Sequence, residues 1–348
     1  LRERSADASR ENDARSFSYS VPKNSRRRFP MIKQFEKAGK FVKQNCTADD
    51  FILRIYSTDS RKTRFAQNAI TQHIDGSNFS ADLTVAFGNK TGSATINQID
   101  EESLKHIIKT AQEIAKFNQP DPEFVSSEGK NDIPEFQNYS ENTANLTAEE
   151  MVNNIGKCIK NAKTKDAALS GITEKNLWQS YIITKNGFEG FDKFSSFSHS
   201  MTLKKDSVET KVARGMKDYN LFDLQKEINQ LNSQFESLGK PQKTPTGKYN
   251  VILRPAAVDN LFAFLYWMMN MRDADEGVNP FTGQLGKQFF GKSFTLRSTL
   301  DDDSLIAQRF TNEGLPGINT NLVKTGVIEN LPTSRYYAQL KGIKPVSQ

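Results

Sequence analysis

The sequence YNVILRP at residues 249–255 opens the stretch that decides the fold of the second half of this 348-residue chain. Its apolar run ends at a proline, which has no backbone N–H with which to continue a strand. Residues 256–270 follow almost without charge and are rich in Leu, Phe, Tyr, Trp and Met, which indicates a buried core helix. Short strand-like runs and turn residues come next. We therefore expect residues 247–348 to form a mainly β C-terminal domain with one buried helix.

The region before this stretch combines a helix with short extended runs. Thr147 and Glu150 have the spacing of a capping box, which predicts a helix that begins at the next residue after Thr147. Extended runs follow over 167–212, and Asn186-Gly187 between two of them is typical of a hairpin turn. We expect residues 148–246 to form a central helix and a β-rich region.

The N-terminal half begins with a basic tail and continues with strands and flanking helices. Four extended patterns lie between a lysine-rich helical pattern at 31–44 and a helix led by Asp100; they cover 51–56, 64–74, 79–87 and 93–97, the last two joined by a turn at 88–92. We expect an N-terminal α/β domain at 31–120 and a Pro-, Asn- and Ser-rich linker at 121–147. The whole chain is then of the α+β class.

The composition restricts the classes of function. Residues 1–30 carry eight Lys or Arg and four Asp or Glu, so they hold +4 of the net charge of +6. We interpret them as a disordered tail upstream of a natural start at Met31, and the nearly neutral remainder does not indicate nucleic-acid binding. No apolar run is long enough to span a membrane. Cys46 and Cys158 match no metal-binding spacing and are expected to be reduced, as in the cytoplasm.

Several motifs together resemble one known family. RFAQNAI at 64–70, and GSA at 92–94 before the acid-led helix, resemble the N-terminal domain of the TldD/PmbA family, also called modulator of DNA gyrase. VILRP at 251–255, GQLG at 283–286 and FTNEGLP at 310–316 resemble its C-terminal domain. The order and spacing of these motifs carry the resemblance over residues 31–345.

The resemblance implies a cytoplasmic dimer associated with a zinc peptidase that degrades short or unfolded peptides. In the active, TldD-type subunit of that family, His-Glu-x-x-x-His lies on the helix after the strand that corresponds to Val251. The two His bind zinc and the Glu activates the metal-bound water. The family also continues beyond the position of Gln348, so the resemblance implies that this copy is truncated.

This chain departs from the zinc motif at each position that does chemistry. Ala263 and Phe264 stand where the first His and the Glu belong, and Met268 stands at the second His. We therefore expect no catalytic residue, no metal and no cofactor, as in the PmbA (TldE-like) subunit. The same segment is interpreted as core packing that keeps the architecture of a metal site. An aromatic pocket for a hydrophobic peptide is the alternative.

Four residues in the family motifs are candidates for peptide or partner contact: Arg64, Asn68, Glu313 and Gly314. Gly314 is expected to serve backbone geometry, and Glu313 to orient a loop or contact a partner. The acidic run at 301–303 has the oxygens to bind a divalent cation, but a solvated turn is the expected role.

The three histidines are the remaining titratable candidates. No two of them have the spacing i, i+4 that would place both on one helical face toward a metal. We expect all three, His73, His106 and His199, to be surface or structural residues.

The leading interpretation is a non-catalytic PmbA/TldE-like subunit of a TldD/TldE-type metallopeptidase complex. It would pair with a TldD-type zinc-bearing subunit, or form a homodimer, and help to hold an extended peptide substrate by strand addition at a sheet edge. Two alternatives stay open: the chain is itself a metallopeptidase with an atypical metal site, or it is a DNA gyrase-linked regulator. Whether it is an enzyme is therefore undecided by the sequence.

Overall fold

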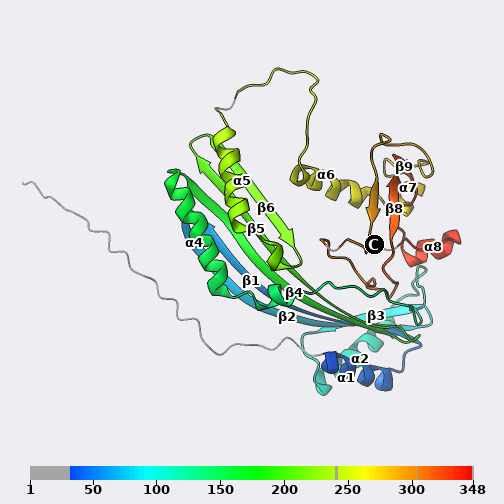
Figure 1. Cartoon of the computed structure of the whole chain (residues 1–348). Helices are drawn as coiled ribbons and strands as arrows, with labels where there is room; N and C mark the ends of the chain where they lie inside the picture. Colours follow the sequence, from blue (N-terminus) through cyan, green and yellow to red (C-terminus); the bar gives the residue numbers. More distant parts are fainter. Residues whose placement is uncertain (1–31, 240–241, 303, 347–348) are drawn as a thin grey trace, which may run out of the picture.

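A computed structural model describes residues 32–239, 242–302 and 304–346. The disordered basic tail at 1–30 and the start at Met31, both expected from the sequence, lie outside these residues. The fold is α+β as predicted, with a long curved antiparallel sheet and a smaller C-terminal domain beside it (Figure 1).

The large sheet has six strands in the order β3-β2-β1-β4-β5-β6. All neighbouring strands are antiparallel, and their bounds are β1 (Asp50–Ala66), β2 (Ala69–Phe87), β3 (Lys90–Ile96), β4 (Ala168–Thr184), β5 (Glu189–Lys205) and β6 (Val208–Met216). Because β1 pairs with β4, the regions on both sides of the expected linker build a single sheet. Strand β3 pairs only with the second half of β2, so within the described residues the outer edge of β2 is free before Ala81.

Two hairpin turns set the register of the long strands. Gln67 and Asn68 join β1 to β2 with φ angles of 50° and 60°, the left-handed conformation that a two-residue type I′ turn requires. The prediction of one continuous extended stretch over 64–74 was therefore wrong at this turn. The predicted turn at Asn186-Gly187 is confirmed, and it joins β4 to β5.

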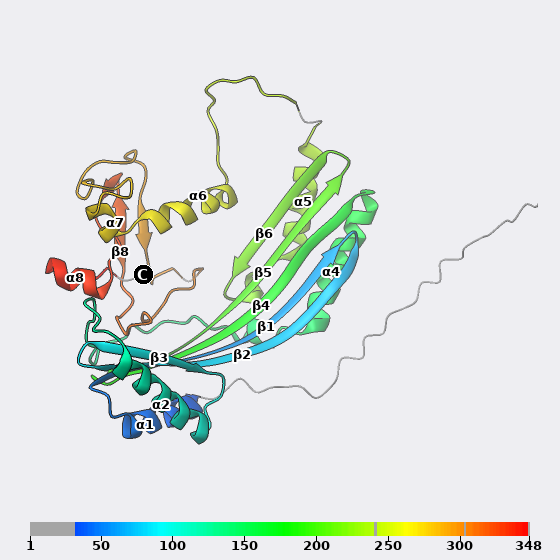
Figure 2. The same cartoon turned by 180° about the vertical axis from the view of Figure 1, so that it is seen from behind.

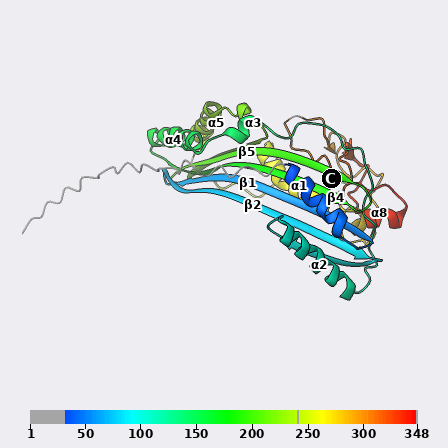
Figure 3. The same cartoon turned by 90° about the horizontal axis from the view of Figure 1, so that it is seen from below.

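Four helices cover one face of the large sheet. α1 (Ile32–Asn45) and α2 (Glu101–Phe117) pack on one end, and α4 (Ala148–Thr164) and α5 (Leu224–Ser237) pack on the other (Figures 1 and 3). Side chains of β1 that share a face show this: Leu53 lies in the core with α1 and α2, while Phe65 lies in the core with α4 and α5. The predicted caps are confirmed, since Asp100 caps α2 and Thr147 forms a capping box with Glu150.

The segment from 118 to 147 is mostly irregular and is fixed to the sheet. It contains the short helix α3 (Glu141–Asn145), and the buried Asp50 at the start of β1 accepts hydrogen bonds from the backbone N–H and hydroxyl of Ser127, at 2.6 and 2.5 Å. A short 3-10 turn, η1 (Tyr219–Leu221), and the buried pair Leu146 and Phe197 complete the packing near α3. This segment therefore lies along the sheet as an ordered strap.

The C-terminal domain lies against the face of the sheet that the four helices leave open (Figure 2). Its elements are α6 (Pro255–Met268), α7 (Met271–Asp275), β7 (Leu296–Ser298), β8 (Thr320–Lys324), β9 (Val327–Ile328) and α8 (Arg335–Lys341), with the strand order β7-β8-β9. Its core contains Phe281, Val323 and Ile328. Ile182 of β4 and Phe310 belong to one buried cluster, which joins the domain to the sheet.

The expected buried helix is present as α6, but the expectation of its burial is wrong. None of its residues is buried; Leu261, Phe264 and Trp267 are 57%, 69% and 78% exposed. These three lie along one helical face because they are three residues apart, and the contacts of α6 with the domain core run through Phe262, Leu265 and Met268. Apolar composition predicted burial here, although the described chain supplies no neighbour for that face.

The apolar run before α6 is also exposed. Residues 249–253 form no strand among the described residues, and Ile252 is 95% exposed. No helix in the described ranges is both long and apolar enough to cross a membrane. Cys46 and Cys158 are buried and are not joined in a disulfide.

Candidate functional site

A hollow of about 290 Å3 lies where the open face of the large sheet meets residues 308–312 of the C-terminal domain. Strands β1, β4 and β5 form its floor, and the chain at Gln308, Phe310 and Asn312 forms its wall. It is the place where segments from both ends of the sequence meet around an accessible space, so it is the candidate site.

The floor is a grid of side chains set by the strand register. Thr58, Trp178 and Phe194 are paired in one row across the three strands, and the next row pairs Tyr56, Ser180 and Asp192; all six line the hollow. The indole ring of Trp178 stacks on Phe194, with 4.9 Å between ring centroids and 23° between planes. Neighbouring residues of one strand face point the same way, so the rings and the carboxylate share one surface.

Hydrogen bonds hold the wall against the floor. Arg54 donates from Nε to the backbone oxygen of Asn312 over 2.7 Å, and the hydroxyl of Tyr56 donates to Oδ1 of the same residue over 3.2 Å. The buried Phe310 packs edge-on against Phe188, with 5.5 Å between centroids. The wall is thus fixed by both polar and apolar contacts.

Asp192 is the charged group of the floor. Its residue is only 8% exposed, and Oδ1 accepts a hydrogen bond from the Lys193 N–H over 2.8 Å. Burial raises the pKa of its carboxyl group, while the nearby Arg309 acts in the opposite direction. The Arg309 guanidinium donates to the backbone oxygens of Pro134 and Phe191, over 2.8 and 3.2 Å, rather than forming a close ion pair with Asp192.

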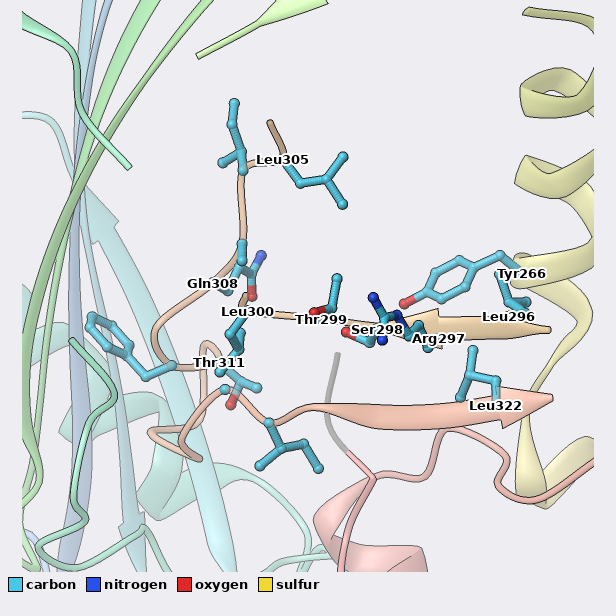
Figure 4. A pocket seen from close by; sticks show the side chains of 15 residues that line it. Tyr266, Leu296, Arg297, Ser298, Thr299, Leu300, Leu305, Gln308, Thr311 and Leu322 are labelled. Carbon is cyan, nitrogen blue, oxygen red and sulfur yellow. The ribbon is translucent and has the colours of Figure 1, made fainter. Parts of the chain in front are cut away.

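A second hollow of about 300 Å3 lies on the other side of this wall, because Gln308 and Phe310 line both. Figure 4 shows Tyr266 reaching from α6 toward Ser298 at the end of β7, with Leu305 and Gln308 on the loop beyond. Burial raises the pKa of the Tyr266 phenol. The lining of the two hollows thus extends from Tyr266 of α6 to strands β1, β4 and β5, with Gln308 and Phe310 between them.

The four predicted contact residues do not come together. Asn68 ties the β1–β2 turn to β4: its side chain donates to the Ala167 oxygen over 2.9 Å and accepts from the Leu169 N–H over 2.8 Å. Arg64 is exposed near the same end of β1. Ten residues of strand, about 30 Å, separate it from Arg54, which contacts the wall at Asn312.

Glu313 and Gly314 lie at the wall. Gly314 has φ +86°, and a Cβ atom there would lie 2.9 Å from the Phe188 ring, which supports its expected role in backbone geometry. Its carbonyl accepts a hydrogen bond from the Asn131 side chain over 3.0 Å. Glu313 is partly exposed, and its N–H donates to the Thr311 hydroxyl over 3.3 Å.

The positions of the zinc motif do not fit a zinc ion. Ala263 and Phe264 are exposed on α6 and Met268 is half-buried. Their side chains offer no imidazole, carboxylate or thiolate, which are the ligands that zinc takes in proteins. Over the described ranges, no cluster of three or more His, Cys, Asp or Glu has a geometry that could hold a metal. In the acidic run, Asp302 accepts from Ser304 and Asp301 accepts from Asn319, while Asp303 is outside the described residues.

The histidines occupy structural positions in the sheet or on its covering helices. His199 is 2% exposed, contacts the Thr173 hydroxyl through Nδ1 over 2.7 Å and stacks on Phe65. His73 contacts the Thr63 hydroxyl in the same way across β1 and β2. His106 is exposed on α2.

Sequence reasoning missed Tyr56, Trp178, Asp192 and Phe194 as site residues. Successive residues of a strand point to opposite faces, so the predicted strands already place Trp178 or Phe194 on one face of its own strand. The pairing of β1 with β4, more than a hundred residues later, has no local signal. The grid therefore becomes visible only in the structure.

Comparisons with known proteins agree with this architecture. The family model described as PmbA/TldA metallopeptidase domain 1 matches residues 53–115, and the model described as the PmbA/TldA metallopeptidase C-terminal domain matches residues 246–347. No curated protein matches the chain.

Three solved structures share the fold. A protein assigned as a modulator of DNA gyrase from Thermotoga maritima has a TM-score of 0.79 at 15% identity, covering 90% of this chain and 73% of its own. TldE from Thermococcus kodakarensis has a TM-score of 0.75 at 18% identity, with coverages of 90% and 72%. A second protein assigned as a modulator of DNA gyrase, from Bacteroides thetaiotaomicron, has a TM-score of 0.77 at 15% identity, with coverages of 91% and 75%. At these identities the likeness shows the fold.

Proposed function

We propose, from the premise that the chain belongs to the PmbA/TldD metallopeptidase family, that it is a non-catalytic, TldE-like subunit of a cytoplasmic peptidase complex. Its partner is a related chain that carries the zinc motif, and its own role is to complete the complex and hold extended peptide. The observation that carries this proposal is the set of side chains at Ala263, Phe264 and Met268. They leave α6 without a ligand or a general base where the family motif has both.

The exposed apolar face of α6 supports the proposal that this chain binds a partner subunit. The stripe Leu261, Phe264 and Trp267 is accompanied by the exposed run at 249–253, within less than twenty residues of chain. Contiguous apolar surface of this kind marks a protein interface more often than free surface. An extended run without a strand partner also offers its backbone groups to a strand of another chain.

The two hollows support a role in holding peptide. They share the wall at Gln308 and Phe310. The hollow beside α6 is lined mostly by apolar side chains, and the hollow on the sheet combines aromatic rings with polar side chains. Concave sites with a few polar groups among apolar walls are typical of ligand-binding sites. An extended peptide has the shape to reach two such neighbouring hollows.

Co-expression with a family member that carries His-Glu-x-x-x-His tests the proposal. The expected result is a stable complex that hydrolyses a denatured peptide and contains zinc, while this chain purified alone contains less than a tenth of an equivalent of zinc and is inactive. Replacing the exposed Ala263, which stands at the position of the first His, by serine in this chain is expected to leave the activity of the complex within about twofold. Stoichiometric zinc together with peptidase activity in the lone chain would overturn the proposal.

A further inference from the structure

We propose that the hollow floored by Tyr56, Trp178 and Phe194 binds the cationic side chain of a lysine or arginine in an extended peptide, with Asp192 as its counter-ion. This inference rests on the proposed peptide-holding function and gives that function a specificity. It is argued from the aromatic walls, the local charge and the shape of the hollow.

The aromatic walls fit a cation. Trp178 and Phe194 stack with 4.9 Å between ring centroids, both are half-buried, and both line the hollow. Tyr56 is fixed by its hydrogen bond to Asn312, and Phe310 closes the hollow from the opposite side. A Lys or Arg head group over such rings is attracted by their quadrupoles, by about 0.5–2 kcal/mol for each close contact.

The chain uses the same interaction on the neighbouring strand surface. Lys193, next to Asp192 in sequence but on the other face of β5, has Nζ 4.0 Å from the centroid of the Tyr139 ring. A lysine ammonium over an aromatic ring therefore already occurs in this chain, on the opposite face of the same strand.

The charge around the hollow favours a cation. The positive charge of Arg309 acts on the Asp192 carboxyl group, and its guanidinium also faces the Glu135 carboxylate at 3.5 Å. Asp192, Glu135 and Arg309 together leave one negative charge. Arg54, beside Tyr56, has an opposing carboxylate in Asp82, because both act on the Tyr56 phenol with opposite signs. An incoming cation thus meets a carboxylate that is already held in place by Lys193 N–H.

The shape fits a long side chain with a charged end. Apolar rings line the hollow and Asp192 lies at one corner of the grid, so a methylene stem can cover the rings while the head reaches the carboxylate. A norleucine side chain would fill the same rings but would bring no charge to the Asp192 carboxylate. A glutamate side chain would place like charges together. The hollow therefore discriminates by charge as well as by apolar area.

Peptide binding to the purified full chain tests this inference. Three acetylated and amidated pentapeptides, Ala-Ala-X-Ala-Ala with X as lysine, norleucine or glutamate, are compared by calorimetry with wild type, Asp192→Asn and Trp178→Leu. The matched control is Asp206→Asn, an exposed carboxylate in the β5–β6 turn whose φ of 51° asparagine tolerates.

Wild type and Asp206→Asn are expected to bind the lysine peptide at least tenfold more tightly than the norleucine peptide. Asp192→Asn is expected to reduce that ratio to about one while keeping its affinity for norleucine, and Trp178→Leu to weaken both peptides. An unchanged lysine preference in Asp192→Asn, or equal binding of lysine and norleucine by wild type, would overturn the inference. The assay uses this chain without any partner, so failure of the subunit role, seen as no complex on co-expression, is scored separately.

Discussion

The Arg54 guanidinium donates a 2.7 Å hydrogen bond to the backbone oxygen of Asn312, joining the interior strand β1 of the large sheet to a wall 258 residues later. The same side chain reaches the Thr84 hydroxyl, at 3.4 Å. Because Asn312 also accepts from Tyr56, this point connects the sheet to the C-terminal domain. Removing the contact therefore tests how strongly the large sheet holds the C-terminal domain in place.

Removing this contact should loosen the wall. Arg54→Ala is expected to cost about 1.5–3 kcal/mol, because hydrogen bonds to charged donors are stronger than neutral ones. Amide hydrogen exchange at residues 308–316 should become faster, and denaturant unfolding should report the loss. Arg64→Ala, at an exposed site on the same strand, is the control and should stay within about 0.5 kcal/mol of wild type. Equal effects of the two variants would contradict the role of Arg54.

A comparison of alanine substitutions at Gly314 and Gly283 separates the cost of backbone conformation from the cost of steric crowding. Gly314→Ala must accept both φ +86° and a Cβ atom 2.9 Å from Phe188, whereas Gly283→Ala must accept only φ +65° with open space around it. Strain of this kind costs about 1–3 kcal/mol for conformation alone. We expect the thermal midpoint to fall further for Gly314→Ala than for Gly283→Ala. Equal shifts would show that the Phe188 contact relaxes freely.

The exposed stripe on α6 should affect association more than folding. Replacing Leu261, Phe264 and Trp267 by serine is expected to change the free energy of unfolding by at most about 0.5 kcal/mol per site, since none is buried. Light scattering should show weaker self-association of the lone chain. The matched control replaces Phe262, Leu265 and Met268, which pack on the domain core, and should destabilise the fold instead. Destabilisation by the first set would mean that this face packs within the chain.

His199 should make stability depend on pH in the acidic range. Burial lowers its pKa from 6.5 to about 4, so between these values the unfolded chain binds more protons than the folded chain. The free energy of unfolding is therefore expected to fall by on the order of 2–3 kcal/mol as the pH decreases from 6.5 toward 4.

The comparison of two variants isolates this titration. His199→Leu should flatten the pH dependence of the unfolding free energy over that range. Met201→Leu, a buried neighbour on the same face of β5, should lower stability at every pH and keep the wild-type slope. A wild-type slope in His199→Leu would assign the pH dependence to other groups.

Local sequence signals predicted the elements well where the physical cause is local. Thr147 and Glu150 satisfy each other's backbone and side-chain groups within one helical turn, so the capping box was readable and is confirmed. The Asn186-Gly187 turn was readable because few residues adopt its backbone conformation. Gln67-Asn68 uses a left-handed turn as well, but glutamine rarely occupies that conformation, so the sequence did not indicate it.

The remaining features depend on partners that are distant in sequence. Trp178 and Asp192 join Tyr56 only through the register of β1 with β4 and of β4 with β5. The exposure of Trp267 depends on which surfaces face α6, and its apolar composition alone cannot show this. The composition of a helix shows that its surface is apolar, but it does not show which residues cover that surface.

The pairing of β1 with β4 also sets a schedule for synthesis. The β1–β2 hairpin can form as soon as it leaves the ribosome, but the inner edge of β1 must wait until Ala168–Thr184 has been made. At about 5–20 residues per second, that delay is on the order of ten seconds. During this interval a nascent chain presents a seventeen-residue strand with an unpaired edge. Chaperone occupancy is therefore expected to be highest just before β4 emerges, and to fall once the sheet closes.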